Sequence, residues 1–344
     1  MAKLQKWISE AFKGPLMGFA SRVALGAILA TFVSACSSVN LQSAVALGNT
    51  GGQTATTYQQ AIAAISPGLD NFMEGQHMLA ALNPDKYLPP TDSLRGRINK
   101  LQSALSARAA LLGQLAQVYS GFIALASYDA SGQVKTSLSA LDGTIDNYAT
   151  ALGAGAPVLP PVATAEITIA GGFLATEYQK RAVLKASRAI SARLQATIDL
   201  LNSENRIYAG LQDEITRGLR DTALALWQHG IGAPDAILAE QMGSFGLTYS
   251  PGSYSRACAT DSGTARAQCQ TRFDQAIAAA IRYRASRIAA LQAETMRSNQ
   301  TALSALIVAH KQFEKGEPLN LATVTQQLAL IRGIVDEINN TRRK

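Results

Sequence analysis

Apolar residues recur at alternating spacings of three and four along most of this chain, and that periodicity constrains the fold more than any other feature. One face of an α-helix carries residues at this spacing, and a run that keeps it over several heptads packs against partner helices as in a coiled coil. A polar turn signal at Thr91-Asp92-Ser93 precedes the clearest run. Its core positions are Ile98, Leu101, Leu105, Arg108, Leu112, Leu115, Tyr119 and Phe122.

Similar runs predict further helices on both sides of this one. Pro84, Pro89 and Pro90 end the first predicted unit, and Ser66-Pro67 interrupts it with a helix restart. Asp129-Ala-Ser-Gly132 predicts a turn, and residues 243–264 predict a loop rich in Gly, Ser and Tyr. Apolar runs from Tyr58 to Phe72 and from Ile98 to Phe122 mark the first two predicted helices. The others cover about residues 133–151, 165–229 and 266–315, followed by a terminal helix with apolar positions from Val324 to Ile338.

Composition agrees with an all-α fold. Alanine, the strongest helix former, supplies 60 of the 344 residues, whereas aromatic residues make up only 6%. No repeat of fixed period occurs, which argues against a helical-repeat array. We therefore expect one elongated antiparallel helical bundle with coiled-coil-like packing over residues 55–344. At 1.5 Å per residue its longer helices would reach about 60–90 Å.

The first 35 residues have the order of a secretory signal peptide. Lys3, Lys6, Lys13 and Arg22 precede the apolar stretch Val23–Val33. Eleven residues of helix rise about 16 Å, which is half of a bilayer core, so the stretch is too short for a stable membrane anchor. Basic, then apolar, then small residues is the pattern that export signals share.

The stretch ends in Val33-Ser34-Ala35-Cys36, which resembles the lipobox of bacterial lipoproteins. The resemblance implies cleavage after Ala35 and a lipid on Cys36, and Ser37 implies sorting to the periplasmic face of the outer membrane. The alternative is an ordinary signal peptide cleaved near Ala35, which would leave Cys36 as a spare thiol. Residues 36–54, rich in Ser, Gly, Asn and Thr, then predict a flexible tether.

Two further cysteines remain, Cys258 and Cys269. An even remainder in an exported chain favours one local disulfide around the Asp261-Ser-Gly263 turn. Zinc is the rival interpretation, but two cysteines without a neighbouring histidine make an incomplete ligand set.

No motif of a dedicated enzyme occurs, so we expect neither catalysis nor a cofactor. The sequence contains no HExxH, GxSxG, GxxxxGK[ST] or GxGxxG pattern. His77, His229 and His310 lie on separate predicted elements, where each is interpreted as a surface or helix-end residue. The carboxylate pairs Asp213-Glu214 and Asp336-Glu337 are interpreted as solvated.

Two clusters of cations suggest an anionic partner. If the two segments pack side by side, they could face lipid headgroups, lipopolysaccharide or a cell-wall polymer. The alternative is a solvated face paired with acids within the chain. Nucleic acid is excluded as a partner by the export signal. The clustered residues are Lys180, Arg181, Lys185, Arg188 and Arg193, followed by Arg272, Arg282, Arg284 and Arg287.

The segment 147–176 carries a single charge, Glu166. An uncharged segment between long helices resembles the membrane-entering heads of helical pore-forming toxins, by analogy alone. The alternative is a buried or covered loop at one end of the bundle.

Together these features predict a lipid-anchored periplasmic bundle that acts as an envelope scaffold or adaptor, with an envelope protein or an anionic envelope polymer as its partner. A membrane-active bundle that inserts residues 147–176 is the alternative function. A third interpretation, a hydrolase with an unfamiliar site, would require a deep polar pocket.

Overall fold

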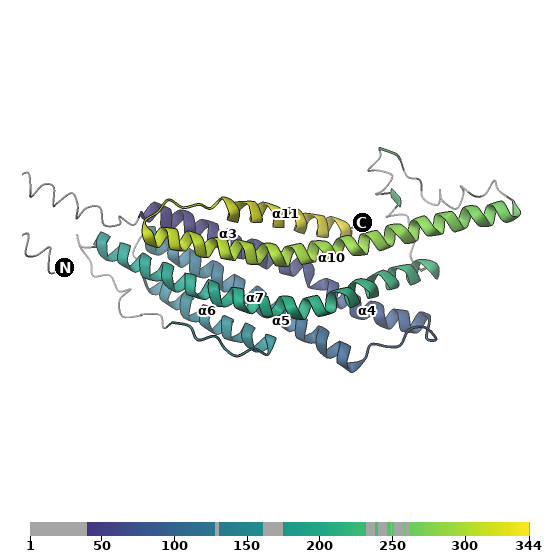
Figure 1. Cartoon of the computed structure of the whole chain (residues 1–344), viewed down its shortest axis with the longest axis horizontal. Coiled ribbons are helices and arrows are strands. Elements are labelled where there is room, and N and C mark those ends of the chain that lie inside the picture. The colour runs from purple at the N-terminus through teal and green to yellow at the C-terminus, as the bar shows by residue number, and fades with distance from the viewer. Residues whose placement is uncertain are drawn as a thin grey trace, which may run out of the picture.

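The helices lie side by side along one long axis in a computed structural model of the chain (Figure 1). The structure describes residues 40–127, 131–160, 175–231 and 262–343, together with 238–239, 246–248, 250 and 258. These residues form an all-α fold without a β-strand. The helices are α3 (Leu41–Ile65), α4 (Pro67–Leu82), α5 (Asp92–Ser127), α6 (Ser131–Leu152), α7 (Ala175–Gln228), α10 (Gly263–Lys315) and α11 (Ala322–Arg343).

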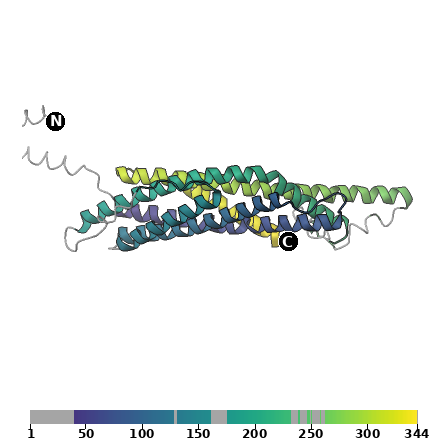
Figure 2. The same ribbon diagram turned by 90° about the horizontal axis from the view of Figure 1, so that it is seen from below.

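Contacts between the helices establish their directions and register: α6 runs parallel to α7, because Asp142 contacts Arg193 while Tyr148 contacts Glu204. Helix α5 runs antiparallel to α7, because Arg97 contacts Glu214 while Arg108 contacts Glu204. Helix α10 also runs antiparallel to α7, and α11 folds back along α10 after a turn at Gly316 (φ 72°). Both views show the resulting rod, with the start of α3 beside the end of α10 (Figures 1 and 2).

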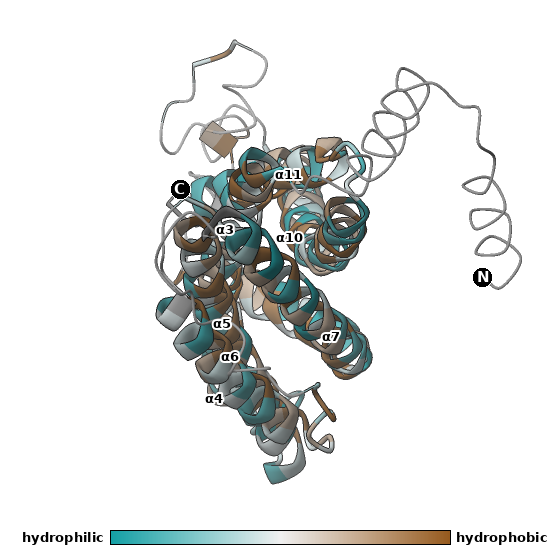
Figure 3. Ribbon diagram, turned by 90° about the vertical axis from the view of Figure 1, so that its left-hand side faces the viewer, coloured by the Kyte–Doolittle hydropathy of each residue, from teal (hydrophilic) through white to brown (hydrophobic). Residues whose placement is uncertain are grey.

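The predicted apolar positions form one continuous core along the rod. Every core position predicted in α5 is buried, including Arg108 at 1% exposure. Helix α5 is long and apolar enough to cross a membrane, but it packs against α3, α6 and α7, which accounts for its composition. Viewed down the rod, apolar and polar residues alternate around each helix, as an amphipathic pattern requires (Figure 3).

Glycines allow α3 to approach α5 closely. A Cβ atom on Gly51 would lie 2.2 Å from the ring of Tyr119, and one on Gly48 would lie 2.5 Å from Ile123. Small residues at a helix crossing let the neighbouring side chain occupy the space that a Cβ would fill. These two positions therefore fix how near the two helices lie.

The prediction of a flexible tether over residues 36–54 is wrong for residues 41–54, which belong to α3. The side chain of Asn40 caps the helix by accepting a hydrogen bond from the backbone N–H of Gln42, at 2.9 Å. The small residues that suggested flexibility are buried against the bundle, among them Ala44, Gly48, Gly51 and Thr54. Residues 36–39 lie outside the described residues.

The helix boundaries otherwise follow the sequence. Ser66 separates α3 from α4 and Pro67 opens α4, as predicted. The expected turn at 129–132 ends earlier, because Gly132 already lies in α6, and the loop expected to end at residue 264 ends before Gly263, where α10 begins. The expected helix over 165–229 is seen as α7 from Ala175, and residues 165–174 lie outside the described residues.

Candidate functional site

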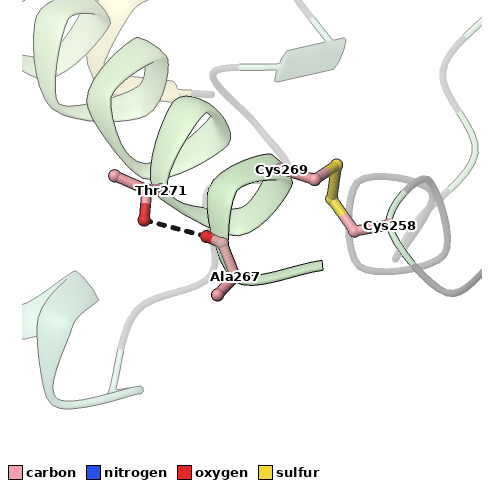
Figure 4. Close-up of a disulfide and its surroundings, with 4 residues drawn as sticks. All are labelled: Cys258, Ala267, Cys269 and Thr271. Atoms are coloured by element: carbon pink, nitrogen blue, oxygen red, sulfur yellow. Dashed lines mark hydrogen bonds between the residues drawn. A yellow bond between two sulfur atoms is a disulfide. The ribbon is translucent and has the colours of Figure 1, made fainter. Parts of the chain in front are cut away.

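The predicted disulfide joins a turn residue to the first turns of α10. The sulfur atoms of Cys258 and Cys269 are 2.02 Å apart and their Cα atoms 5.7 Å apart (Figure 4). The bond fastens the segment before α10 to the helix itself, so the prediction of this pair is confirmed. Cys36, the predicted lipid site, lies outside the described residues.

The two cation clusters do not pack side by side, because α7 and α10 run antiparallel. The α7 cluster, Lys180 to Arg193, lies beside the C-terminal end of α10, where Arg188 approaches Glu314 at 3.7 Å. The α10 cluster lies beside the end of α11, where Arg287 bonds to Glu337 at 2.8 Å. From Arg287 to Glu314 the helix rises about 40 Å. The joint cationic surface that the clusters could have formed is therefore absent from the described bundle.

Within the α7 cluster most cations contact groups of the chain itself. Lys180 bonds to Glu177 at 2.8 Å, and Arg181 is exposed. Arg193 is buried and bonds to Asp142 of α6 through two hydrogen bonds of 2.6 Å. The expectation that Arg193 belongs to a cationic surface is wrong, since its guanidinium joins two helices inside the bundle. Lys185 also has a partner within the chain.

One histidine departs from the sequence-based interpretation. His77 and His229 are exposed, as expected for surface and helix-end residues. His310 is fully buried in α10 and contacts residues of α5 and α7, so its interpretation as a surface residue is wrong.

His310 is held by hydrogen bonds at both ring nitrogens. Its Nε2 lies 3.0 Å from the hydroxyl of Tyr119, and its Nδ1 lies 2.8 Å from Oγ of Ser187. The Ser187 hydroxyl donates to Oε1 of Glu314 at 3.1 Å. Because that hydroxyl has one proton, it accepts from Nδ1–H, and Nε2 accepts from Tyr119. The chain of bonds thus selects one tautomer.

Burial keeps this histidine uncharged. It lowers the pKa of His310 to about 3, and it raises the pKa of the Tyr119 hydroxyl and of the Glu314 carboxyl. His310 and Ser187 are both 0% exposed, so a substrate could not reach the serine. The arrangement therefore satisfies polar groups inside the bundle and does not present a nucleophile.

A second polar layer surrounds Arg108. Its Nη1 donates to Oε1 of Glu204 at 3.1 Å and lies 2.9 Å from the sulfur of Met296. The hydroxyl of Tyr148 donates to the other oxygen of Glu204. Arg108 and Glu204 are 1% and 0% exposed. Helices α5, α6, α7 and α10 therefore meet around one buried ion pair.

Further polar contacts join helix pairs at other levels of the rod. The hydroxyl of Tyr208 in α7 donates to Gln292 of α10 at 2.8 Å. Tyr58 of α3 and Ser298 of α10 are also 2.8 Å apart, and both are buried. Together with the His310, Arg108 and Arg193 contacts, we call these the polar rungs. Each rung pairs different side chains, so each one specifies a single register between its helices.

Heptad position could have revealed the rungs that the sequence analysis missed. His310 lies between Leu306 and Phe313 at spacings of four and three, so it occupies a core position of α10. Glu204 occupies the equivalent position of α7 between Leu201 and Tyr208. A polar residue at a core position is the same signal that singled out Arg108.

The uncharged segment 147–176 divides between the bundle and residues that the structure does not describe. Its first part ends α6, where Tyr148 and Ala149 are fully buried. Gly153 (φ 69°) ends the helix, and Val158 is exposed. Residues 161–174 lie outside the described residues. The part that lies in α6 therefore contributes to the core.

The surface of the described bundle carries shallow grooves. One, of about 530 Å³, lies between α5 and α6 and is lined by small and uncharged polar side chains, among them Gln102, Ser106 and Thr144. Another, of about 460 Å³, lies along α3 and α5 beside Arg332. Among the described residues, no three His, Cys, Asp or Glu side chains gather closely enough to hold a metal ion.

Comparison with known proteins gives no relative for this chain, since no family model, no curated protein and no solved structure matches it. The geometry of the described bundle therefore carries the functional argument.

Proposed function

We propose that this chain is a lipid-anchored protein of the envelope of a Gram-negative bacterium, in which the helical bundle serves as a scaffold or adaptor. The lipobox-like Val33-Ser34-Ala35-Cys36 supplies the anchor, and Ser37 favours the periplasmic face of the outer membrane. The bundle supplies a long surface for contact with an envelope partner.

One observation carries this proposal: helix α3 begins at Leu41, five residues after Cys36, and its N-cap Asn40 is four residues after it. An extended chain spans at most about 3.5 Å per residue, so Asn40 lies within about 14 Å of a lipidated cysteine. The start of α3, which Asn40 caps, is at one end of the rod (Figure 1). A lipid on Cys36 would thus fasten the rod by its end and leave its long sides open to partners.

The disulfide supports an exported location. Disulfides persist in oxidising compartments such as the bacterial periplasm and are rare in the cytosol. The bond between Cys258 and Cys269 therefore fits a chain that leaves the cytosol, as its N-terminal segment also indicates.

The surface favours a scaffold over an enzyme. Catalytic pockets bury most of a ligand, whereas these grooves of the described bundle are open to solvent. No specific observation favours the membrane-active alternative. Residues 147–152, the first part of the segment that would insert, belong to helix α6 of the bundle.

Metabolic labelling with an alkyne-tagged palmitate tests the anchor. We expect label on the wild-type chain and none on Cys36→Ala. The double variant Cys258→Ser/Cys269→Ser is the matched control and should keep its label. An unlabelled wild type, or label that survives Cys36→Ala, would overturn the proposal.

A further inference from the structure

The N-terminal turns of α10 extend beyond the ends of α4 and α7, whereas Ala289 of α10 lies beside Gln212 of α7 (Figures 1 and 2). We call residues 263–290 of α10 the arginine arm. The arm contains five arginines, no lysine and one acidic residue, Asp274. It lies at the end of the rod opposite Asn40, since α10 finishes beside the start of α3. The arm is therefore the most basic part of α10 and lies at its far end.

Two of the five arginines of the arm contact groups of the chain itself. Arg287 bonds to Glu337 of α11, and Arg284 also has a partner within the chain. Arg266, Arg272 and Arg282 are exposed, and none of them forms an ion pair with the residues that the structure describes. These three side chains can therefore meet an external anion.

The helical geometry places two of these arginines on the outward face of the arm. Ile277 and Ile281 are buried and mark the inward face. At 100° per residue, Arg272 and Arg282 both point away from it. Tyr283 shares the outward face and is 73% exposed. Exposed arginines beside a tyrosine offer planar donors for carboxylates or phosphates together with a hydroxyl for hydrogen bonding.

The spacing of the arginines argues against a small ligand. Ten residues of helix separate Arg272 from Arg282, which is about 15 Å, and Arg266 lies about 9 Å further along. A single small anion cannot contact side chains so far apart, and none of the grooves described above includes them. The row of charges fits a partner whose own negative charges repeat along a chain.

The position of the arm argues against the membrane that would hold Cys36. Arg272 lies about 65 Å along α10 from the helix end beside Asn40. The screening length at physiological salt is only about 8 Å, so headgroups at the anchored end cannot attract the arm across the length of the rod. If the rod is fastened at the end near the start of α3, the arginines of the arm face envelope components that lie farther from that membrane.

We propose that the arginine arm binds a carboxylate-bearing glycan polymer of the cell wall, through Arg272 and Arg282 on its outward face with Tyr283 alongside, and through the exposed Arg266 nearer the end of the helix. This inference rests on the proposed anchoring for its geometry. The arm would then link the wall to the membrane that holds the lipid.

Co-sedimentation of the full-length chain with purified cell-wall sacculi tests the inference. We expect wild type to sediment with sacculi at about 0.15 M salt and to be released at about 0.5 M salt, because the contact is ionic. Arg266→Gln/Arg272→Gln/Arg282→Gln should lower the bound fraction about tenfold, which corresponds to about 1.4 kcal/mol. Lys100→Gln/Lys135→Gln/Arg206→Gln is the matched control, since it removes three exposed cations elsewhere and should change binding less than about twofold.

The assay separates this inference from the proposed function. Cys36→Ala should bind sacculi as wild type does, because the assay does not depend on the lipid. The inference is overturned if wild type fails to sediment, if the arm variant binds as well as the control variant, or if the arm prefers vesicles of anionic phospholipid to sacculi. Failure of the palmitate label alone would overturn only the anchor.

Discussion

The buried ion pair of Arg108 and Glu204 makes the sharpest prediction about stability. Arg108→Met removes the guanidinium and leaves the carboxylate of Glu204, which is 0% exposed, without its cation. Breaking such a pair by removing one partner costs about 3–5 kcal/mol, because the remaining charge is uncompensated. Domains are commonly stable by about 5–15 kcal/mol, so we expect this single change to remove a large share of the free energy of unfolding.

Removing the second charge should restore most of that loss. In Arg108→Met/Glu204→Leu no charge remains in the layer, but the hydroxyl of Tyr148 loses its acceptor. An unsatisfied buried hydroxyl costs about 1–3 kcal/mol. The triple variant that adds Tyr148→Phe should therefore be more stable than the double variant and close to wild type, since apolar residues replace buried ion pairs at little cost.

Urea unfolding followed by far-UV circular dichroism measures these differences. Arg97→Met is the matched control, because Arg97 and Glu214 join the same two helices at 2.9 Å but are about half and one-third exposed. An exposed pair contributes less than about 1 kcal/mol. The reasoning is refuted if Arg108→Met costs no more than Arg97→Met, or if the triple variant is as unstable as Arg108→Met.

Other predictions concern single positions. The pKa of His310 in the folded state, about 3, lies below the value of about 6.5 for an unfolded chain, so the unfolded state alone binds the proton between these values. The free energy of unfolding should thus fall by up to about 1.4 kcal/mol per pH unit as pH drops from 6.5 towards 3. In urea titrations at several pH values, His310→Gln should show a smaller dependence of this free energy on pH than wild type. Equal pH dependence in both proteins would contradict the prediction. Gly51→Ala should lower stability by about 1–3 kcal/mol, because its Cβ meets the ring of Tyr119, and an unchanged or higher melting temperature would argue against that contact. Cys258 and Cys269 are 11 residues apart, and closing a loop of this length stabilises by about 3 kcal/mol. Reducing the disulfide should therefore speed backbone hydrogen exchange in the first turns of α10 but not in α5. Exchange rates in α10 that stay the same after reduction would contradict this prediction.

The sequence predicts the helices well because burial in a bundle depends on local spacing. The heptad positions of α5 and α7 are buried as their periodicity requires. The start of α3 could not be predicted in the same way, because Gly48 and Gly51 have low helix propensity and suggest flexibility when considered alone. Their helical state depends on α5, whose Tyr119 and Ile123 fill the space that the glycines leave.

The pairings in most of the polar rungs could not be predicted from the sequence, because each joins residues that lie far apart along the chain. Arg108 was recognised as a core position because its own helix places it there. The burial of His310 depends on Tyr119 and Ser187, which are 191 and 123 residues away along the chain. The two cation clusters were misjudged for a related reason, since only the antiparallel order of α7 and α10 decides how far apart they lie.

The polar rungs also decide how the rod would bear a mechanical load. If Cys36 carries the proposed lipid, tension between that end and the arginine arm would shear α10 along α7. In a core of leucines alone, a slip of seven residues, about 10.5 Å, would replace each contact with an equivalent one. Here the same slip would separate His310 from Ser187 and Gln292 from Tyr208 at once, and would bury every one of these polar groups without a partner. All of these contacts therefore oppose sliding at the same time. Under increasing force we expect the helices to separate in one step and not to slide gradually past one another.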